Sequence, residues 1–214
     1  MIKIFLQGHF LEFLTNPNII FYVVAYLIGG IPFGLILAKK FAGVDIRSSG
    51  SQSIGATNVL RVVKEKDPKL AKKLGIATLV FDALKAAVII LIAMAFDMKE
   101  QTLWSIAVLA ILGHCFSPFL KFQGGKGVAT AIGSILVLLP IEGFVGITVW
   151  VIMAKTLKIS SISSLSGVLA AVVASFFIHP ELAHAPFVLI GFIIFYKHIP
   201  NIVRLIKKEE KRVV

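Results

Sequence analysis

The sequence predicts an all-α integral membrane protein, a single domain over residues 1–214 with seven transmembrane helices. Two features of the composition support this prediction: 57% of the residues are hydrophobic and only 15% are charged. A third feature is the mean hydropathy of +0.92. A chain with so few polar side chains cannot cover the surface of a water-soluble fold of this length.

Seven apolar stretches are separated by charged residues, prolines or glycines. In chain order they are 19–38, 74–96, 102–120, 128–139, 141–154, 162–178 and 185–196. The fourth and fifth stretches are shorter than the roughly 20 residues that a full crossing needs. They could instead form one helix kinked at Pro140, so the stretches alone permit six spans or seven.

The distribution of basic residues decides between these counts. With seven spans and the N-terminus outside, Lys3 and Lys99 lie outside, Lys85 lies within a span, and the rest of the 22 cations lie in the cytoplasm. Six spans would send either the basic 39–73 loop or the basic C-terminus outward, against the positive-inside rule. We therefore expect a multi-pass protein of the cell inner membrane, with its C-terminus cytoplasmic. The net charge of +11 is then mainly a topology signal, and we expect no nucleic acid partner.

The second apolar stretch contains an acid and a base three residues apart, Asp82 and Lys85. On a helix they share one face and can pair. Ionisable residues at membrane depth are costly and usually functional. A structural ion pair and a direct substrate contact by Lys85 both remain open.

Three glycines and a lysine stand between the third and fourth stretches: Gly124, Gly125, Lys126 and Gly127. Glycines let successive backbone N–H groups converge on an oxyanion, the following helix offers its positive N-terminus, and Lys126 adds a full charge. The run predicts a phosphate site at the membrane surface. It is not a Walker A nucleotide site, because Lys126 is followed by glycine rather than Ser or Thr.

The 39–73 loop is rich in small and hydroxyl residues between two cations, Arg47 and Arg61. Its groups can surround an oxyanion, with the arginines making forked contacts. The candidate ligands are Ser51, Gly55, Thr57, Asn58 and Arg61. The alternative is a flexible loop that its arginines hold near the lipid headgroups.

After the seventh stretch, His198, Asn201 and Arg204 recur at spacings of three, so a helix would place them on one face. Their side chains suit a phosphate or a hydroxyl group. His114 precedes the glycine run at the end of the third stretch. Three cytoplasmic segments thus supply polar groups, which predicts short helices around a membrane-embedded pocket that opens to the cytoplasm.

Missing motifs narrow the chemistry. The sequence has no HxxxxD acyltransferase signature, no GxSxG elbow and no cluster of metal-ligating Cys, His and carboxylate residues. We therefore expect neither a cofactor nor a metal.

These segments, in order and over nearly the whole chain, resemble the motifs of the bacterial membrane acyl-phosphate:glycerol-3-phosphate acyltransferase family. Residues 51–61 resemble its first motif and 113–130 its second. Its third motif is matched by His198, Asn201, Arg204 and Glu210, and a further pair by Asp82 and Lys85.

The chain departs from the family pattern at two places that bear on the site. The first motif commonly reads Ser-Gly-Asn-Pro-Gly, whereas this chain has Ser51-Gln52-Ser53-Ile54-Gly55. Lys208 stands where the third motif commonly has Gly. These departures leave the shapes of the two segments open.

The resemblance implies seven transmembrane helices with the N-terminus outside. It also implies a fatty acyl-phosphate donor and glycerol 3-phosphate as acceptor. The products would be 1-acyl-glycerol 3-phosphate (lysophosphatidic acid) and phosphate, in the first acylation of phospholipid synthesis. The implied partners are membrane lipid and, in the pathway, the acyltransferase that makes the acyl phosphate.

The resemblance also implies roles for the residues. Donor-phosphate binding would fall to Ser51, Gly55, Thr57, Asn58, Arg61, Gly124, Gly125 and Gly127. Acceptor binding would fall to Lys85, Lys126, His198, Asn201 and Arg204, with Asp82 and Glu210 structural. The candidate catalytic residues are Lys126, His198, Asn201 and His114. The general base stays open between His198, His114 and an oxygen of the donor phosphate.

Two other classes of protein share some of these features. A transporter for a phosphorylated solute would also place ion pairs in the membrane and anion sites at helix ends. It would be expected to have polar residues on both membrane faces or an inverted repeat. A structural membrane subunit would tolerate Lys126→Ala without loss of activity in its complex.

Overall fold

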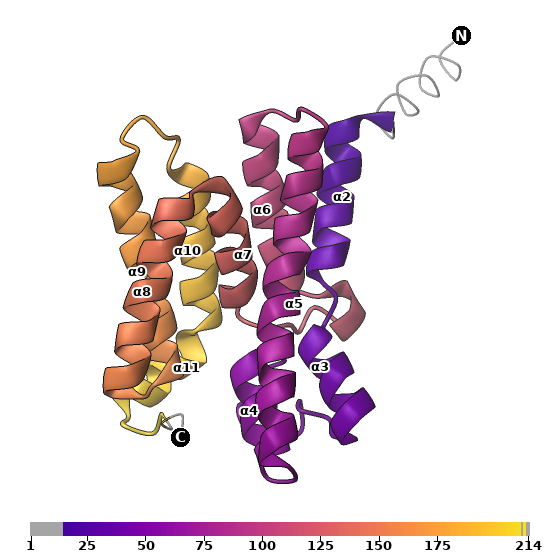
Figure 1. The fold of residues 1–214 in the computed structure, drawn as a ribbon, viewed down its shortest axis with the longest axis vertical. Helices are drawn as coiled ribbons and strands as arrows, with labels where there is room; N and C mark the ends of the chain where they lie inside the picture. The colour runs from indigo at the N-terminus through magenta and orange to yellow at the C-terminus, as the bar shows by residue number, and fades with distance from the viewer. Residues whose placement is uncertain (1–14, 211, 213–214) are drawn as a thin grey trace.

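The computed structural model describes residues 15–210 and residue 212. Within those residues every regular element is helical. In Figure 1, α8, α9 and α10 form one group, α2, α5 and α6 form another, and α7 lies between them. The helices are α2 (Pro17–Gly29), α3 (Phe33–Leu37), η1 (Ala38–Ala42), α4 (Ala56–Lys64), α5 (Pro68–Ala95), α6 (Glu100–Cys115), η2 (Pro118–Leu120), α7 (Val128–Leu138), α8 (Pro140–Leu157), α9 (Ser160–Ile178), α10 (Ala185–Lys197) and α11 (Ile199–Ile206).

Five helices of the described chain are long and apolar enough to cross a membrane, and six are if α10 and α11, bent by 56°, form one span. The apolar α7 has 11 residues, or about 16 Å of helix, which is about half of the ~30 Å hydrocarbon core. The all-α membrane fold is confirmed. The seventh span and the orientation of the termini stay predictions, and Lys3 lies outside the described residues.

The fourth and fifth apolar stretches form two helices, not one kinked helix. Leu139 separates them, with φ −139° and ψ 76°. Pro140 then occupies the first turn of α8, where its missing N–H costs nothing. The new helix therefore starts at the proline, and α7 remains a short element in the middle of the bundle (Figure 1).

Helix α5 begins six residues before its apolar stretch because Asp67 caps it. The Asp67 carboxylate accepts hydrogen bonds from the backbone N–H groups of Lys69 (2.8 Å) and Leu70 (3.0 Å), and Pro68 follows at the first position. Such a cap satisfies donors that have no partner inside a helix. The 28-residue helix consequently runs from the exposed lower end of the bundle to its upper end (Figure 1).

Small residues let α2 and α6 approach closely. A Cβ atom at Gly29 would overlap the backbone of Ala110, and one at Gly113 would overlap the backbone of Tyr26. Close contact through glycine is typical of helices that pack within lipid. The Tyr26 hydroxyl also donates to the Phe116 carbonyl at 2.8 Å. These contacts fix the lower end of α6, from which the site is built.

Candidate active site

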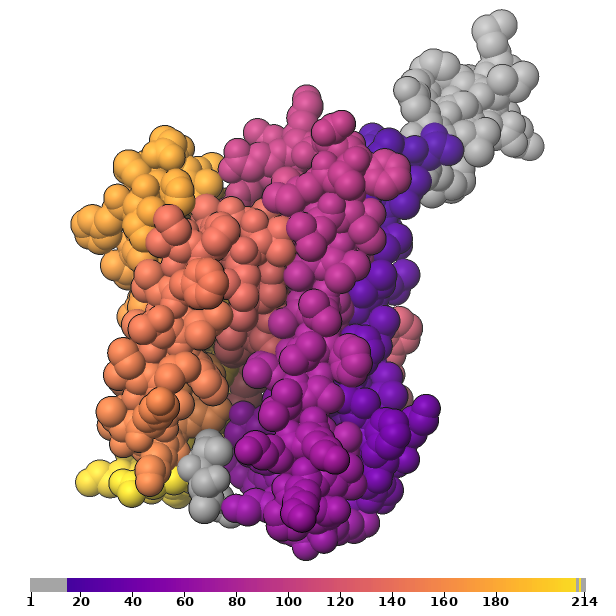
Figure 2. Space-filling model, in the orientation of Figure 1, coloured from indigo at the N-terminus to yellow at the C-terminus, as the bar shows by residue number. Residues whose placement is uncertain are grey.

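A cavity of about 610 Å³ opens between the two helix groups. Figure 2 shows the molecule hollowed on this face between α8 and α5. The volume falls within the range of small-molecule sites. One wall is apolar and comes from α5, α7 and α8, with Leu79, Val80, Ile132, Ile147, Trp150 and Val151. The other wall is polar and comes from the segment before α4, from α4 itself, and from the starts of α7, α9 and α11.

Three cations line the polar wall: Arg61, Lys126 and Arg204. Arg204 is paired, since its Nε lies 2.6 Å from Oε2 of Glu210. Within the described part of the chain, the side chains of Arg61 and Lys126 make no hydrogen bond or ion pair. Burial is the main effect that lowers the pKa of the Lys126 amine, to about 8. The nearby positive charges of Arg204, Arg61 and Lys197 also lower this pKa, and the negative charge of Glu210 raises it. Two uncompensated cations in one cavity call for an anion.

The glycine loop, residues 121–127, folds back onto the end of α6. The N–H of Gly124 donates to the Cys115 carbonyl (3.2 Å) and that of Gly125 to the His114 carbonyl (2.9 Å). A Cβ at Gly124 would overlap the α6 backbone, and one at Gly125 would overlap the His114 imidazole. In this structure these two N–H groups are therefore used within the protein, and neither residue lines the cavity.

Gly127 does line the cavity, together with Lys126 and the first residues of α7. Its φ of +83° is left-handed, which glycine adopts without strain. It precedes the first turn of α7, whose N–H groups have no partner within the helix. The start of α7 therefore presents N–H groups and the positive end of its dipole to the cavity beside Lys126.

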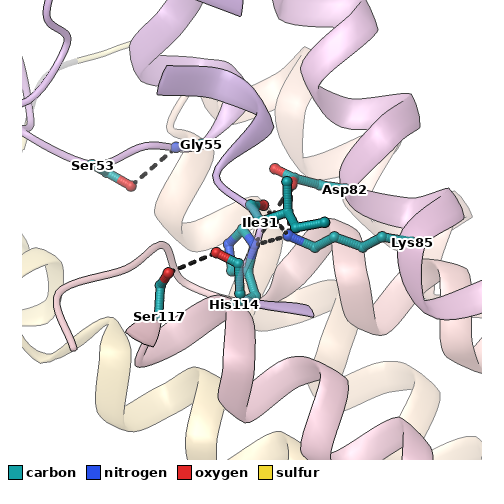
Figure 3. A network of polar contacts seen from close by, with 8 residues as sticks. Ile31, Ser53, Gly55, Asp82, Lys85, His114 and Ser117 are labelled. Carbon is teal, nitrogen blue, oxygen red and sulfur yellow. Dashed lines mark hydrogen bonds and ion pairs between the residues drawn. The ribbon is translucent and has the colours of Figure 1, made fainter. Parts of the chain in front are cut away.

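A buried polar network adjoins this wall (Figure 3), and two of its members, Asp82 and His114, line the cavity. The Lys85 ammonium contacts the Asp82 carboxylate at 2.8 Å, the Ile31 carbonyl at 3.1 Å and Nδ1 of His114 at 2.9 Å. These contacts use all three of its donors, and Lys85 does not line the cavity. An ammonium only donates, so Nδ1 of His114 accepts and the hydrogen-bond pattern assigns the ring hydrogen to Nε2. His114 is thus held as a donor toward the glycine loop.

The serine loop, residues 44–55, is organised by the buried side chain of Asn58. Its Nδ2 donates to the carbonyls of Ile46 (2.7 Å) and Ser53 (2.9 Å), and its Oδ1 accepts from the N–H of Ser51 (2.8 Å). The hydrogen-bonding groups of Asn58 are therefore engaged inside the loop. Thr57 bonds across to Ser160 at 3.1 Å, which joins the start of α4 to the start of α9.

Ser51 and Gly55 line the cavity with Arg61, as the sequence predicts. Arg47 does not. It lies outside the cavity, where its guanidinium bonds the Asp45 carboxylate at 2.6 and 2.9 Å and holds the pKa of that carboxyl well below its usual value. Arg47, which the sequence analysis considered for a phosphate contact, is therefore paired with Asp45.

Three residues at the start of and within α11, His198, Asn201 and Arg204, also line the cavity. Nδ1 of His198 lies 2.8 Å from the Ile194 carbonyl and must donate to it, so the lone pair is on Nε2. Asn201 donates through Nδ2 to Glu210 at 2.6 Å. Its Oδ1 is buried and has no hydrogen-bond partner among the described residues. Both residues line the cavity, which leaves one acceptor atom on each that a ligand can engage.

Glu210 links two helices, α9 and α11. Its carboxylate accepts from Asn201, from Arg204 and from the hydroxyl of Ser161 at 2.9 Å. Burial alone would raise the pKa of this carboxyl, but these hydrogen bonds lower it below its usual value. The structural role of Glu210 stays a prediction.

Sequence reasoning missed the contribution of α9. Ser160, Ser161 and Ser164 line the cavity from the first turns of this helix. The sequence does contain a signal for this polar surface, because four of the five residues 160–164 are serines at the beginning of an otherwise apolar stretch.

Two positions where the family pattern has Gly carry other residues here, and both are left-handed. Gln52 and Lys208 each have a φ of 58°. Gln52 and Lys208 therefore have a backbone conformation that glycine adopts easily, and this conformation is strained for a residue with a side chain.

The fold and the cavity define a multi-pass membrane protein with a cation-lined cavity beside a wall of apolar side chains. Comparison with known proteins gives the family. A family model described as glycerol-3-phosphate acyltransferase matches residues 19–208, and the chain belongs to this family.

Individual relatives agree over almost the full length. A glycerol-3-phosphate acyltransferase of a Nitratiruptor species is 65% identical over 207 residues, which cover 95% of this chain and 99% of the relative. A crystal structure of PlsY, an integral membrane glycerol 3-phosphate acyltransferase, in its glycerol 3-phosphate form superposes with a TM-score of 0.82 at 33% identity, covering 91% of this chain and 94% of that one. The lysophosphatidic acid form of PlsY gives a TM-score of 0.81 at the same identity and coverage. The family resemblance of the motifs is confirmed.

Proposed function

We propose that the protein transfers a fatty acyl group from an acyl phosphate to the 1-hydroxyl of glycerol 3-phosphate. The products are 1-acyl-glycerol 3-phosphate and phosphate, in the first acylation of phospholipid synthesis. The reaction takes place at the cytoplasmic face of the cell inner membrane, supplied by an acyltransferase that makes the acyl phosphate. One observation carries the proposal: a single cavity joins an apolar wall to two uncompensated cations, Arg61 and Lys126.

The donor fits the cavity in two parts. Its acyl chain lies along the apolar wall, where α5 and α8 leave a hollow (Figure 2). Its phosphate lies near Arg61, Ser51 and Thr57, which offer a guanidinium and two hydroxyls. In this arrangement Asn58 shapes the serine loop and does not itself bind phosphate, because its polar atoms are already bonded.

The acceptor lies between the glycine loop and α11. Lys126 and the start of α7 bind the phosphate of glycerol 3-phosphate through charge and N–H groups, whereas the family resemblance assigned Gly127, just before this helix, to the donor phosphate. Asn201 Oδ1, buried and unpartnered among the described residues, accepts a hydrogen bond from a glycerol hydroxyl. Arg204 adds positive charge and holds Glu210. Lys85 does not contact the acceptor itself but orients His114 through their hydrogen bond.

The reaction then needs little more than placement and charge. The 1-hydroxyl gives its proton to a general base as its oxygen attacks the acyl carbonyl carbon. The bond from that carbon to the phosphate oxygen breaks, and phosphate leaves with the bonding electrons. Holding the two reactants in contact can lower the barrier by about 7–11 kcal/mol. Donors aimed at the developing oxyanion, such as Lys126 and the His114 Nε2–H, add about 3 kcal/mol each.

We infer from the hydrogen-bond pattern that the general base is one of two groups rather than one of three. His114 is unsuited, because its Nδ1 is occupied by Lys85 and its Nε2 carries the hydrogen. His198 has a lone pair on Nε2 at the cavity, and an oxygen of the donor phosphate is the other acceptor. His198→Gln separates the two: a near-normal kcat with a raised KM for glycerol 3-phosphate excludes His198 as the base, and a large loss of kcat assigns it.

The proposed function is tested by phosphate release from palmitoyl phosphate by the purified protein in lipid, with and without glycerol 3-phosphate. We expect release that depends on the acceptor and that, at glycerol 3-phosphate concentrations below the parent KM, falls to near background in Lys126→Ala. Lys99→Ala, at the far end of the bundle, is the matched control and should retain the activity. No acceptor-dependent release from folded protein would overturn the assignment, and uptake of labelled glycerol 3-phosphate into proteoliposomes would then test the transporter alternative.

A further inference from the structure

Helix α11 has an apolar face that the protein leaves uncovered. It follows α10 after a bend of 56°. Ile199, Val203 and Ile206 are 48%, 43% and 77% exposed. At about 100° of rotation per residue they lie within about 60° of one another, so they form one stripe. In water this stripe would be unfavourable.

The opposite face of α11 belongs to the cavity. Asn201 and Arg204 lie about 140–200° around the helix from Ile199, and both line the cavity. Asn201 is the only buried residue of the helix. The polar bonds from Asn201 and Arg204 both end on Glu210. Contacts within the described protein thus hold α11 on its catalytic side and leave the other side without support.

The surroundings of the stripe indicate what covers it. Phe192 and Tyr196 of α10 are 69% and 62% exposed and extend the apolar surface of the bundle toward α11. At the other end of the stripe, the helix is followed by two exposed lysines, Lys207 and Lys208. An apolar face bordered by cations is the pattern of a helix that lies in the interface of an anionic membrane.

We propose that α11 is an interfacial helix whose apolar stripe inserts into the membrane surface on the cavity side, with Lys207 and Lys208 binding anionic lipid headgroups. Because the same short helix carries Asn201 and Arg204 on its other face, this docking also sets the geometry of the acceptor site. The second part of the proposal rests on the proposed function; the first part does not.

The docking is tested by a nitroxide spin label at Ile206→Cys in proteoliposomes that contain phosphatidylglycerol. Leu91→Cys, exposed on the apolar C-terminal half of α5, serves as the lipid reference, and Lys64→Cys at the end of α4 as the water reference. Cys115 is buried, and treated parent protein gives the blank. We expect the Ile206 label to be more accessible to oxygen than to a water-soluble nickel chelate, at a shallower depth than Leu91.

Two results would overturn the docking. Accessibility to the chelate equal to that at Lys64 would place the stripe in water. Protection from both oxygen and chelate would mean that protein, such as a second copy of the chain, covers it.

The coupling is tested by the KM for glycerol 3-phosphate in phosphatidylcholine vesicles with and without phosphatidylglycerol. Lys207→Gln/Lys208→Gln removes the proposed lipid contacts. Lys72→Gln/Lys73→Gln removes the same charge from the exposed start of α5 as a matched control. We expect anionic lipid to lower KM roughly fivefold in the parent and the control, and to leave the Lys207/Lys208 variant almost unchanged.

An equal lipid response in all three proteins would overturn the coupling. Absence of activity in all three would instead count against the proposed function, and the spin-label result would still decide the docking.

Discussion

The serine loop and the glycine loop both bring small residues to the cavity, but they are held in shape by opposite means. The serine loop is arranged around one buried side chain, since Asn58 bonds three separate points of its backbone. The glycine loop is fastened by its own backbone to the carbonyls of His114 and Cys115. There the absence of side chains at Gly124 and Gly125 makes the contact possible. The shape of the serine loop therefore depends on the hydrogen bonds of the Asn58 side chain. The shape of the glycine loop depends on the absence of a Cβ atom at Gly124 and Gly125, which lets its backbone approach α6.

The largest contrast between the two loops is expected from a single methyl group added to the glycine loop. Gly125→Ala places a Cβ on the His114 imidazole, so the loop and Lys126 must shift. A displacement of about 1 Å in a catalytic group can cost about 100-fold in rate. We expect a loss of that size in kcat/KM, measured by phosphate release.

Gly55→Ala in the serine loop is the matched control for this change. Its Cβ would meet nothing closer than the Ser53 hydroxyl at 3.8 Å, so we expect a loss of only about twofold. Equal losses in the two variants would contradict the steric account of the glycine loop.

The serine loop should respond to loss of its organising side chain. Asn58→Leu keeps the volume but leaves the Ser51 N–H and two carbonyls without partners, at about 1–3 kcal/mol for each buried group. We expect a lower Tm together with lost activity, measured by thermal unfolding in detergent. Lys126→Ala should lose activity without losing Tm, because it removes a charge that the fold leaves unpaired. A normal Tm in Asn58→Leu would show that the amide does not hold the loop.

The charge at Lys126 gives a pH dependence that the serine loop lacks. Burial lowers the pKa of its amine to about 8, so the cation is present below that pH and is lost as pH rises through it. A bound phosphate will move this midpoint upward. We expect the KM for glycerol 3-phosphate to climb above pH 8, toward about tenfold per unit.

Lys126→Arg should make this KM profile flat, because a guanidinium stays charged with a pKa above about 12. A rise of the same size in the arginine variant would assign the pH dependence to another group.

The smallest effect concerns backbone strain in the serine loop. Gln52 has a φ of +58°, which costs an L-residue about 1–2 kcal/mol. Gln52→Gly should therefore raise Tm by a few degrees. Ser49→Gly, at a neighbouring position without positive φ, should lower it through the entropy of the unfolded chain. A lower Tm in both variants would mean that the Gln52 side chain stabilises the loop by contacts.

Composition and spacing predicted which segments meet at the cavity, but not which hydrogen bonds each residue makes there. Apolar stretches separated by cations identify helices and their ends, so the convergence of Arg61, Lys126, His198 and Asn201 could be predicted. The hydrogen-bond partners of these polar groups could not be predicted, because a sequence does not show which backbone carbonyls lie close to a side chain or a loop. Lys85 is taken by Ile31 and His114, and the N–H groups of Gly124 and Gly125 by the end of α6.

The central claim is that each loop holds one of the two phosphates, the serine loop through Arg61 and the glycine loop through Lys126. The most direct test is two-substrate steady-state kinetics of Arg61→Ala and Lys126→Ala in lipid. The account predicts a raised KM mainly for the acyl phosphate in Arg61→Ala and mainly for glycerol 3-phosphate in Lys126→Ala. If both variants raised the KM of the same substrate, the assignment of one phosphate to each loop would be wrong.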